Sequence, residues 1–313
     1  MKIIKTILES DFLINDPPVL VDIGASGEIN KKWKNIAPYC ICIAFDADDR
    51  EFHITEQING TYKKLITFNR VVTVEPVERT NFYLTVSPFC SSLLEPDPKS
   101  LEPWIFRDLF RIEREKQLPS ITLHQALKQL NITAIDWFKT DTQGTDLRLF
   151  KSVLPYLQSP ILAVEFEPGI IDAYKGEDKL YSVMKEMKEN NFWLSSMNVQ
   201  GTQRLNADYI AKIGSSMSKR IVRKTPAWAE VTYFKQPDLE SPRQFLLLYV
   251  FALLERQYGF ALEVVTIASQ KFPNVLFQDC SRAIWKIIEN EKMKAPLVIL
   301  KRQLKKLFAS VND

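Results

Sequence analysis

The sequence is poor in the residues that build disulfide frameworks and zinc sites. Its 313 residues include only four cysteines and two histidines. The cysteines are scattered except for Cys40 and Cys42, which lie in an apolar run where strand alternation would place both side chains on one face. This pattern indicates a reduced, cytoplasmic protein. Two isolated histidines, His53 and His124, argue against a zinc site.

A strong excess of charge of one sign is also missing. Lysine and arginine number 41 and aspartate and glutamate 38, which gives a formal net charge of +3. Proteins that bind nucleic acid need a basic surface against the phosphate charge. The near balance of charge therefore argues against a nucleic-acid partner.

No hydrophobic run is long enough to cross a membrane. The longest, residues 245–254, has about ten residues, whereas a membrane-spanning helix needs about twenty. The apolar stretch near the N-terminus is interrupted by Glu9, Ser10 and Asp11, which is not typical of a signal peptide. We therefore expect a soluble protein without a transmembrane segment.

Short apolar runs alternate with helix-like segments between residues 19 and 213, which predicts an α/β fold with a mostly parallel sheet. The expected strands cover residues 19–23, 41–45, 71–74, 135–140, 161–167, 192–197 and 208–213. The expected helices cover residues 122–130, 145–157 and 178–190. Residues 75–119 contain six prolines and are expected to form an irregular excursion over the sheet edge, where binding pockets are often built.

The pattern becomes purely helical after Pro237. Helices are expected at residues 242–257, 260–271, 278–291 and 297–311. We therefore expect an α/β domain over residues 1–236 and a helical extension over residues 237–313. The last helix would carry leucines on one face and lysines and arginine on the other. Such a helix either docks on the protein, which is the commoner case, or makes a peripheral contact with an anionic membrane.

A glycine-containing turn follows the first expected strand. Residues 19–27 are Val-Leu-Val-Asp-Ile-Gly-Ala-Ser-Gly, and Gly24 and Gly27 would let the backbone approach a ligand closely. Asp22 is expected near a cationic part of this ligand, and the amides after it near a carboxylate. A dinucleotide site would need three glycines in the pattern G-x-G-x-x-G. The turn here has only Gly24 and Gly27, so it does not match that pattern. A purely structural turn remains the alternative.

The second expected strand ends in Asp46-Ala47-Asp48-Asp49. Nucleoside-binding sheets place a carboxylate at this position because it accepts hydrogen bonds from the ribose hydroxyls. Asp46 is the expected ribose ligand. A solvated acidic turn is the alternative.

Two later strands also end in acidic residues. Residues 135–146 lead from an apolar strand through Asp141, Gln143 and Gly144 into a helix, and this strand is expected beside the first one. Residues 161–168 end in Glu165 and Glu167, which are expected on the same face. Buried carboxylates at a sheet edge are costly unless they bind something, so these residues are candidates for a site.

Together these segments resemble the FkbM family of methyltransferases over residues 18–213. The matching segments, in order, are Asp-Ile-Gly-Ala-Ser-Gly with Trp33, Phe-Asp-Ala-Asp, Cys90-Ser91-Ser92-Leu93-Leu94-Glu95-Pro96, Ile121-Thr122-Leu123, Phe-Lys-Thr-Asp-Thr-Gln-Gly-Thr-Asp-Leu and Ala-Val-Glu-Phe-Glu. The Lys-x-Asp-x-Gln-Gly segment is the most specific. The chain departs from the family in its glycine turn, which is one residue shorter, and in Leu123-His124, which stands where the family has Leu-Asp.

The resemblance implies a Rossmann-like class I methyltransferase fold with seven strands, the last of them antiparallel. It implies S-adenosylmethionine as the methyl donor and a hydroxyl group of a sugar, glycolipid, polysaccharide or natural product as the acceptor. Asp22, Gly24 and Gly27 would hold the methionine end, Asp46 the ribose, and Asp141 and Gln143 would lie at the reaction centre. The full expected set of cofactor-binding residues is Asp22, Gly24, Ala25, Ser26, Gly27, Asp46, Ala47, Asp48, Asp141 and Gln143.

A hydroxyl acceptor must lose its proton, so a general base within hydrogen-bond reach is expected. We assign this role to Asp141, with Glu165 as a contact to the acceptor and His124 as the rival base. Asp141, Glu165 and Glu167 are also oxygen donors that suit a divalent cation, but this is the less favoured interpretation.

Two other classes of function stay open. A catalytically inactive relative would use the same fold as a binding or scaffolding module, although the joint presence of Asp22, Asp46 and Asp141 argues against it. A nicotinamide-dependent oxidoreductase is disfavoured by the missing third glycine. The sequence indicates neither the identity of the acceptor nor the oligomeric state.

Overall fold

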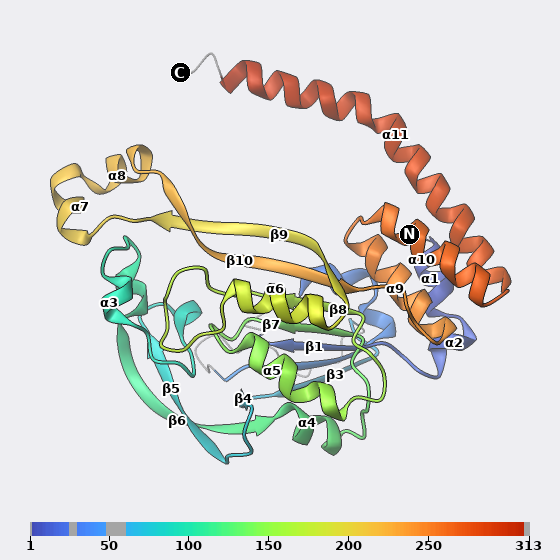
Figure 1. The fold of residues 1–313 in the computed structure, drawn as a ribbon, viewed down its shortest axis with the longest axis horizontal. Helices are drawn as coiled ribbons and strands as arrows, with labels where there is room; N and C mark the ends of the chain where they lie inside the picture. Colours follow the sequence, from blue (N-terminus) through green and yellow to red (C-terminus); the bar gives the residue numbers. More distant parts are fainter. Residues whose placement is uncertain (1, 25–29, 48–60, 310–313) are drawn as a thin grey trace. The chain divides into compact units, whose positions relative to one another are not determined.

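The structure is a computed structural model that describes residues 2–24, 30–47 and 61–309 (Figure 1). The chain divides into two compact units, one formed by residues 16–236 and the other by residues 1–15 together with residues 237–313. The N-terminal residues thus join the helical unit, whereas the sequence pattern placed them in the α/β domain.

The helical unit explains this difference. Its helices are α1 (Lys2–Leu8), α2 (Asp11–Ile14), α9 (Pro242–Leu254), α10 (Tyr258–Lys271) and α11 (Val275–Ala309). Helix α9 is buried along almost its whole length, so it needs cover on every face. Helices α1 and α2 both contact α9 and supply part of that cover, with Ile4, Ile7 and Leu8 of α1 buried.

The end of the chain also differs from the prediction. The expected helices at residues 278–291 and 297–311 belong to the single helix α11. Pro296 lies between the two expected helices, and a proline inside a helix can remove one backbone hydrogen bond and bend the helix without ending it. Among the helices that the structure describes, none combines the length and the apolar character that a membrane span requires.

The α/β unit is built on a seven-stranded sheet with the order β3-β2-β1-β7-β8-β10-β9. Strands β3 to β8 of this order pair in parallel, whereas β10 pairs antiparallel with both of its neighbours. The expected Rossmann-like fold with one antiparallel strand is therefore confirmed. The strands are β1 (Val19–Ile23), β2 (Ile41–Phe45), β3 (Lys64–Phe68), β7 (Trp137–Thr140), β8 (Ala163–Phe166), β9 (Phe192–Gln203) and β10 (Lys224–Lys235).

Both faces of this sheet are covered within the unit. Helices α4 (Leu123–Gln129), α5 (Asp146–Val153) and α6 (Leu180–Glu189) bury their apolar faces against one side, where Val21, Phe138 and Val164 alternate into the core. On the other side Trp33, from the 3₁₀ turn Lys31–Asn35, packs edge-to-face on Trp137 with ring centroids 6.0 Å apart.

The predicted strand at residues 208–213 is wrong, because this segment is helix α7 (Ala207–Ile213). The Asn206 side chain accepts a hydrogen bond from the Asp208 N–H at 3.0 Å and so caps the helix start. Two strands of the sheet, β3 and β10, were not predicted, and the strand predicted at residues 71–74 is β4 (Val71–Thr73) of a second sheet. In β10, Ala227, Ala229 and Val231 are buried alternately. Helix α8 (Ser215–Ile221) lies between α7 and β10 in the chain.

The proline-rich excursion is more regular than its composition indicated. It contains β5 (Arg79–Thr85) and most of β6 (Ile112–Thr122), which form a three-stranded sheet with β4 (Val71–Thr73). Strand β6 pairs antiparallel with β5 and parallel with β4. Helix α3 (Pro98–Leu101) and two 3₁₀ turns, Pro88–Cys90 and Arg107–Phe110, lie between β5 and β6 in the chain.

Candidate functional site

A cavity of about 470 Å³ opens at the carboxyl ends of β1, β2 and β7. These three strands are parallel neighbours, so Gly24, Asp46 and Asp141, which follow them, meet at one sheet edge, and all three line the cavity. This edge is where parallel α/β sheets bind their ligands. The volume falls within the range of small-molecule sites.

The turn after β1 is fixed by its neighbours on both sides. The Gly24 N–H donates to the Phe45 carbonyl at 2.9 Å, and the Asp141 N–H donates to the Ile23 carbonyl at 2.9 Å. Gly24 has a φ of +82°, and a Cβ atom there would lie 2.0 Å from the Asp141 main-chain oxygen. A glycine is therefore required at position 24. The predicted cofactor-binding residues Ala25, Ser26 and Gly27 lie outside the described residues.

Asp22 is fully buried and does not line the cavity. Its Oδ1 accepts a hydrogen bond from Lys139 Nζ at 2.7 Å, and its Oδ2 accepts one from the Asn30 N–H at 3.1 Å. Burial lowers the pKa of Lys139, but the Asp22, Asp141 and Glu165 carboxylates outweigh burial and raise it. The negative charge of Asp22 is thus neutralised by Lys139 of β7. The second carboxylate oxygen of Asp22 binds the backbone at Asn30, after the glycine turn.

Asp46 and Ala47 line the cavity directly after β2. The Asp46 N–H donates to the Phe68 carbonyl at 3.2 Å, which fixes the backbone at the end of β2 against β3. The Asp46 side chain is buried almost completely. The two residues therefore lie where the sequence predicted, at the sheet edge beside Gly24. Asp48 lies outside the described residues.

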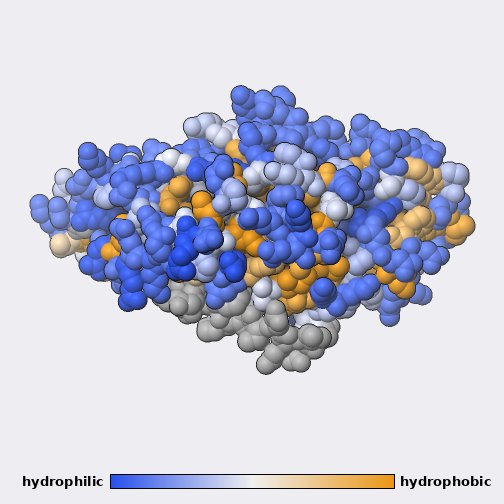
Figure 2. All heavy atoms as spheres, turned by 90° about the horizontal axis from the view of Figure 1, so that it is seen from below, coloured by the Kyte–Doolittle hydropathy of each residue, from blue (hydrophilic) through white to orange (hydrophobic). Residues whose placement is uncertain are grey.

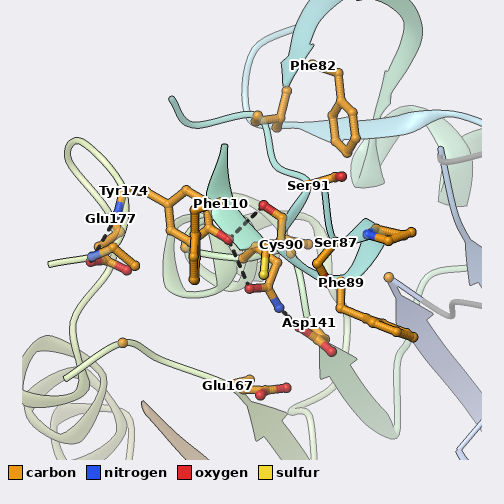
Figure 3. Close-up of a pocket in the computed structure, with 18 of the residues that line it drawn as sticks. Phe82, Ser87, Phe89, Cys90, Ser91, Phe110, Asp141, Glu167, Tyr174 and Glu177 are labelled. Carbon is orange, nitrogen blue, oxygen red and sulfur yellow. Dashed lines mark hydrogen bonds between the residues drawn. The ribbon is translucent and has the colours of Figure 1, made fainter. Parts of the chain in front are cut away.

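A hydrogen-bond relay orients Asp141 (Figure 3). Gln143 Nε2 donates to Asp141 Oδ1 at 2.7 Å, and the Tyr174 hydroxyl lies 3.2 Å from Gln143 Oε1 and 2.9 Å from the Cys90 carbonyl oxygen. Burial raises the pKa of Tyr174 well above its usual value, so its hydroxyl stays a donor. Since a carboxylate only accepts hydrogen bonds, Gln143 turns its amide nitrogen toward Asp141 and its amide oxygen toward the Tyr174 hydroxyl.

Glu167 forms a carboxyl pair with Asp141 in the cavity wall (Figure 3). Burial, the Asp141 charge and a hydrogen bond to Asp141 raise the pKa of Glu167 to about 9. This upward shift favours the protonated form of Glu167 at neutral pH, which can donate a hydrogen bond to Asp141. The sequence predicted Glu167 as a candidate site residue at the sheet edge and, in the less favoured interpretation, as a metal ligand, but not as the partner of Asp141. Its position just after β8, the neighbour of β7, was the signal that could have paired it with Asp141.

Asp146 was not predicted as a site residue, although it begins helix α5. It is buried, and its carboxylate accepts hydrogen bonds from the Thr142 N–H at 2.9 Å and the Glu167 N–H at 3.1 Å. One side chain thus ties the turn after β7 to the end of β8. This connection sets the distance between the Asp141 and Glu167 backbones.

Two predicted catalytic residues lie outside the cavity lining. Glu165 accepts hydrogen bonds from Asn30 Nδ2 at 3.0 Å and Lys32 Nζ at 2.9 Å, and unlike Glu167 it does not line the cavity. His124, in helix α4, stacks on Tyr156 with ring centroids 3.7 Å apart. Among the described residues, no cluster of three or more His, Cys, Asp or Glu side chains is arranged to hold a metal ion.

Much of the cavity wall is aromatic. Phe106 stacks nearly parallel on Trp228 at 6.3 Å, and Phe110 packs edge-to-face against both Phe106 and Tyr174. The other aromatic side chains of the lining are Phe45, Phe82 and Phe89. The ionisable lining is mainly acidic, since four carboxyl groups face one guanidinium: Asp46, Asp141, Glu167 and Glu177 against Arg70.

Comparison with known proteins adds little to this geometry. No protein-family model matches the chain, and no curated protein does. Among solved structures the chain is similar to the plantazolicin methyltransferase BpumL in complex with SAH, at 10% sequence identity and a TM-score of 0.31. That match covers 75% of this chain and 85% of the other. Likeness at this level does not establish a shared function, and membership of the FkbM family stays a prediction.

Proposed function

We propose that the protein is an S-adenosylmethionine-dependent O-methyltransferase. The observation that carries the proposal is the meeting of Gly24, Asp46 and Asp141 around one cavity at the carboxyl ends of three parallel strands. A sheet of this topology binds nucleoside ligands at that edge. The resemblance of the sequence to methyltransferases supports the choice of nucleoside.

The residues present fit this cofactor. Asp46 offers a nearly buried carboxylate at the end of β2, which suits the two hydroxyls of a ribose. Phe45, Val71 and Val72 form an apolar wall beside it, which suits a purine ring. The Asp46 and Asp141 carboxylates face a single guanidinium, that of Arg70, in the lining, and this negative excess suits a cationic sulfonium.

Bound S-adenosylmethionine would supply an electrophilic methyl group to an acceptor placed beside it. The chain must then align the acceptor oxygen and remove its proton. Asp141 is the carboxylate that we assign as the proton acceptor. Gln143 holds it through a hydrogen bond of 2.7 Å, and Glu167 supplies a second donor. A general base in such a position typically contributes about 10²–10⁴ in rate.

We propose two changes to the roles predicted from the sequence. Glu167, rather than Glu165, is the second carboxyl group that we propose at the reaction centre, because Glu167 lines the cavity and Glu165 does not. We leave His124 out of the mechanism because it stacks on Tyr156 instead. A sugar, glycolipid or natural-product hydroxyl remains the acceptor class, as the sequence resemblance implies.

Calorimetric titration with S-adenosylhomocysteine tests the proposal. We expect binding with a dissociation constant in the micromolar range or below, and no binding of reduced nicotinamide dinucleotide. Absence of S-adenosylhomocysteine binding would favour the inactive scaffold. Binding of the dinucleotide instead would favour an oxidoreductase.

The assignment of Asp141 has its own test. With a methyl-accepting compound in hand, Asp141→Asn should lower methyl transfer by about 10²–10⁴ while S-adenosylhomocysteine still binds. Lys188→Asn, on the exposed side of α6, is the control and should keep full transfer. Full turnover of Asp141→Asn would show that another group removes the proton.

A further inference from the structure

The hairpin of β9 and β10 extends well past its neighbour in the sheet. Each strand has twelve residues, but β10 pairs with β8 only through residues 231–234. The rest of β10 pairs with β9 as a two-stranded ribbon that ends in helices α7 and α8 (Figure 1). We call α7, α8 and the adjoining residues 222–224 the hairpin tip.

The hairpin tip exposes large apolar side chains at a regular spacing. Tyr209, Ile213, Met217 and Ile221 follow one another every four residues, and their exposed fractions are 56%, 36%, 51% and 62%. In each short helix this spacing places both members on one face. The face of the molecule drawn in Figure 2 is mostly hydrophilic, and its hydrophobic residues gather in patches. Apolar residues gathered this way mark interaction surfaces.

The same segment is strongly basic. Residues 207–224, which make up the hairpin tip, contain five basic residues and a single acidic one, Asp208. Lys212, Arg220, Arg223 and Lys224 are exposed, and none of these four forms an ion pair with a described residue. This local excess of positive charge contrasts with the near neutrality of the whole chain.

We propose that the hairpin tip docks on an anionic lipid membrane. Apolar side chains next to lysines and arginines are typical of segments that lie in the membrane interface. The apolar side chains insert between the lipids, and the basic side chains bind the anionic headgroups. Nucleic acid would match the charge but not the exposed methionine and isoleucines. The sequence suggested a membrane contact for the basic C-terminal helix. The hairpin tip is a second membrane-binding segment, distinct from that helix.

Docking would bring the membrane beside the cavity. Lys224 is three residues from Ala227, which lines the cavity together with Trp228. Three residues of strand span roughly 10 Å. An acceptor anchored in lipid would then be within reach of the site. This consequence rests on the proposed methyltransferase function, whereas docking itself does not.

Co-sedimentation of the full chain with vesicles tests the docking. The probes are vesicles of phosphatidylcholine alone and of phosphatidylcholine with phosphatidylglycerol. We expect binding to the anionic vesicles only, and weaker binding at high salt. Arg220→Gln/Arg223→Gln should lower the affinity by at least tenfold, since each basic residue near the surface contributes about fivefold. Met217→Glu/Ile221→Glu should abolish the binding.

The controls separate the hairpin tip from other surfaces. Tyr181→Glu/Met184→Glu places the same charges on exposed apolar positions of α6 and should leave vesicle binding unchanged. Retained S-adenosylhomocysteine binding or an unchanged circular dichroism spectrum shows that the tip variants are folded. The proposal is overturned if the wild-type protein does not bind anionic vesicles. It is also overturned if only Leu300→Glu/Leu304→Glu, in the C-terminal basic helix, loses vesicle binding. Conversion of a dimer to a monomer by the tip variants would overturn it as well, because the tip would then bind a second copy of the chain.

Discussion

The backbones of Gly24 and Asp141 approach each other so closely that a Cβ atom on Gly24 would lie 2.0 Å from the Asp141 main-chain oxygen. The turns after β1 and β7 are therefore packed directly on each other at the sheet edge. The position of Asp141 in the cavity depends on this contact, because the residue has no freedom to move toward β1.

We expect Gly24→Ala to destabilise the protein strongly, since it combines a steric clash with a left-handed φ of +82°. The free energy of unfolding should fall by at least about 3 kcal/mol in urea titrations. Gly176→Ala is the matched control, because Gly176 has a φ of +71° and nothing within 4 Å of its hypothetical Cβ. It should cost only about 1–2 kcal/mol. Equal costs would contradict the close contact at Gly24.

The raised pKa of Glu167 predicts a pH dependence of stability. Its pKa rises from 4.5 to about 9 on folding, so the native state holds the proton more tightly than the unfolded chain. The contribution to stability is complete below pH 4.5 and declines as the pH rises toward 9. Glu167→Gln mimics the protonated form and should lose this decline. As the pH rises, the urea concentration at the unfolding midpoint should fall for the wild type and change less for Glu167→Gln. Equal changes of the midpoint with pH in both proteins would contradict the raised pKa of Glu167.

The pairing of Lys139 with Asp22 predicts a large effect of removing one partner. Lys139→Met leaves the Asp22 carboxylate buried without its cation and should lower the free energy of unfolding by about 3–5 kcal/mol. The double variant Lys139→Met/Asp22→Leu should be more stable than Lys139→Met alone. Costs that simply add in this double-mutant cycle would show that the pair is not coupled.

Tyr174→Phe removes the hydroxyl that contacts the Cys90 carbonyl and the Gln143 amide. The buried carbonyl is left without this donor, so the variant should lose about 1–3 kcal/mol of stability. Gln143 also loses the contact that sets its orientation, so methyl transfer should fall more than S-adenosylhomocysteine binding does. The ratio of the two effects, from calorimetry and turnover, distinguishes a positioning role from a merely structural one.

The sequence predicted those parts of the fold in which the apolar pattern is unambiguous. Strands β1 and β2 have the predicted bounds because each is a mainly apolar run followed directly by a glycine or an acidic residue. The pattern of Asp208 to Ile213 fits a strand and a helix equally well, and the Asn206 cap decides for the helix. Strand β10 was not predicted because Pro226 interrupts its apolar alternation. In the structure an irregularity in the pairing with β9 between Pro226 and Trp228 accommodates the proline.

For the site, sequence position identified residues at the ends of strands but not the directions of their side chains. Gly24, Asp46 and Asp141 meet because parallel neighbours end at one edge. Glu165 and Glu167 were expected together, yet Lys32 and Asn30 hold the first and Asp141 the second. These partners are far apart in sequence, so no local pattern could reveal the separation. The aromatic wall likewise joins Phe106 to Trp228 across more than a hundred residues.

The affinity of Asp46→Asn for S-adenosylhomocysteine tests the central claim most directly, namely that the edge formed by β1, β2 and β7 holds a nucleoside. Hydrogen bonds from ribose hydroxyls to a charged carboxylate contribute about 1.5–3 kcal/mol, so calorimetry should show binding that is roughly 10- to 150-fold weaker than that of wild type. Glu189→Gln, an exposed acid on α6, should bind as wild type does. Unchanged affinity of Asp46→Asn would contradict the account.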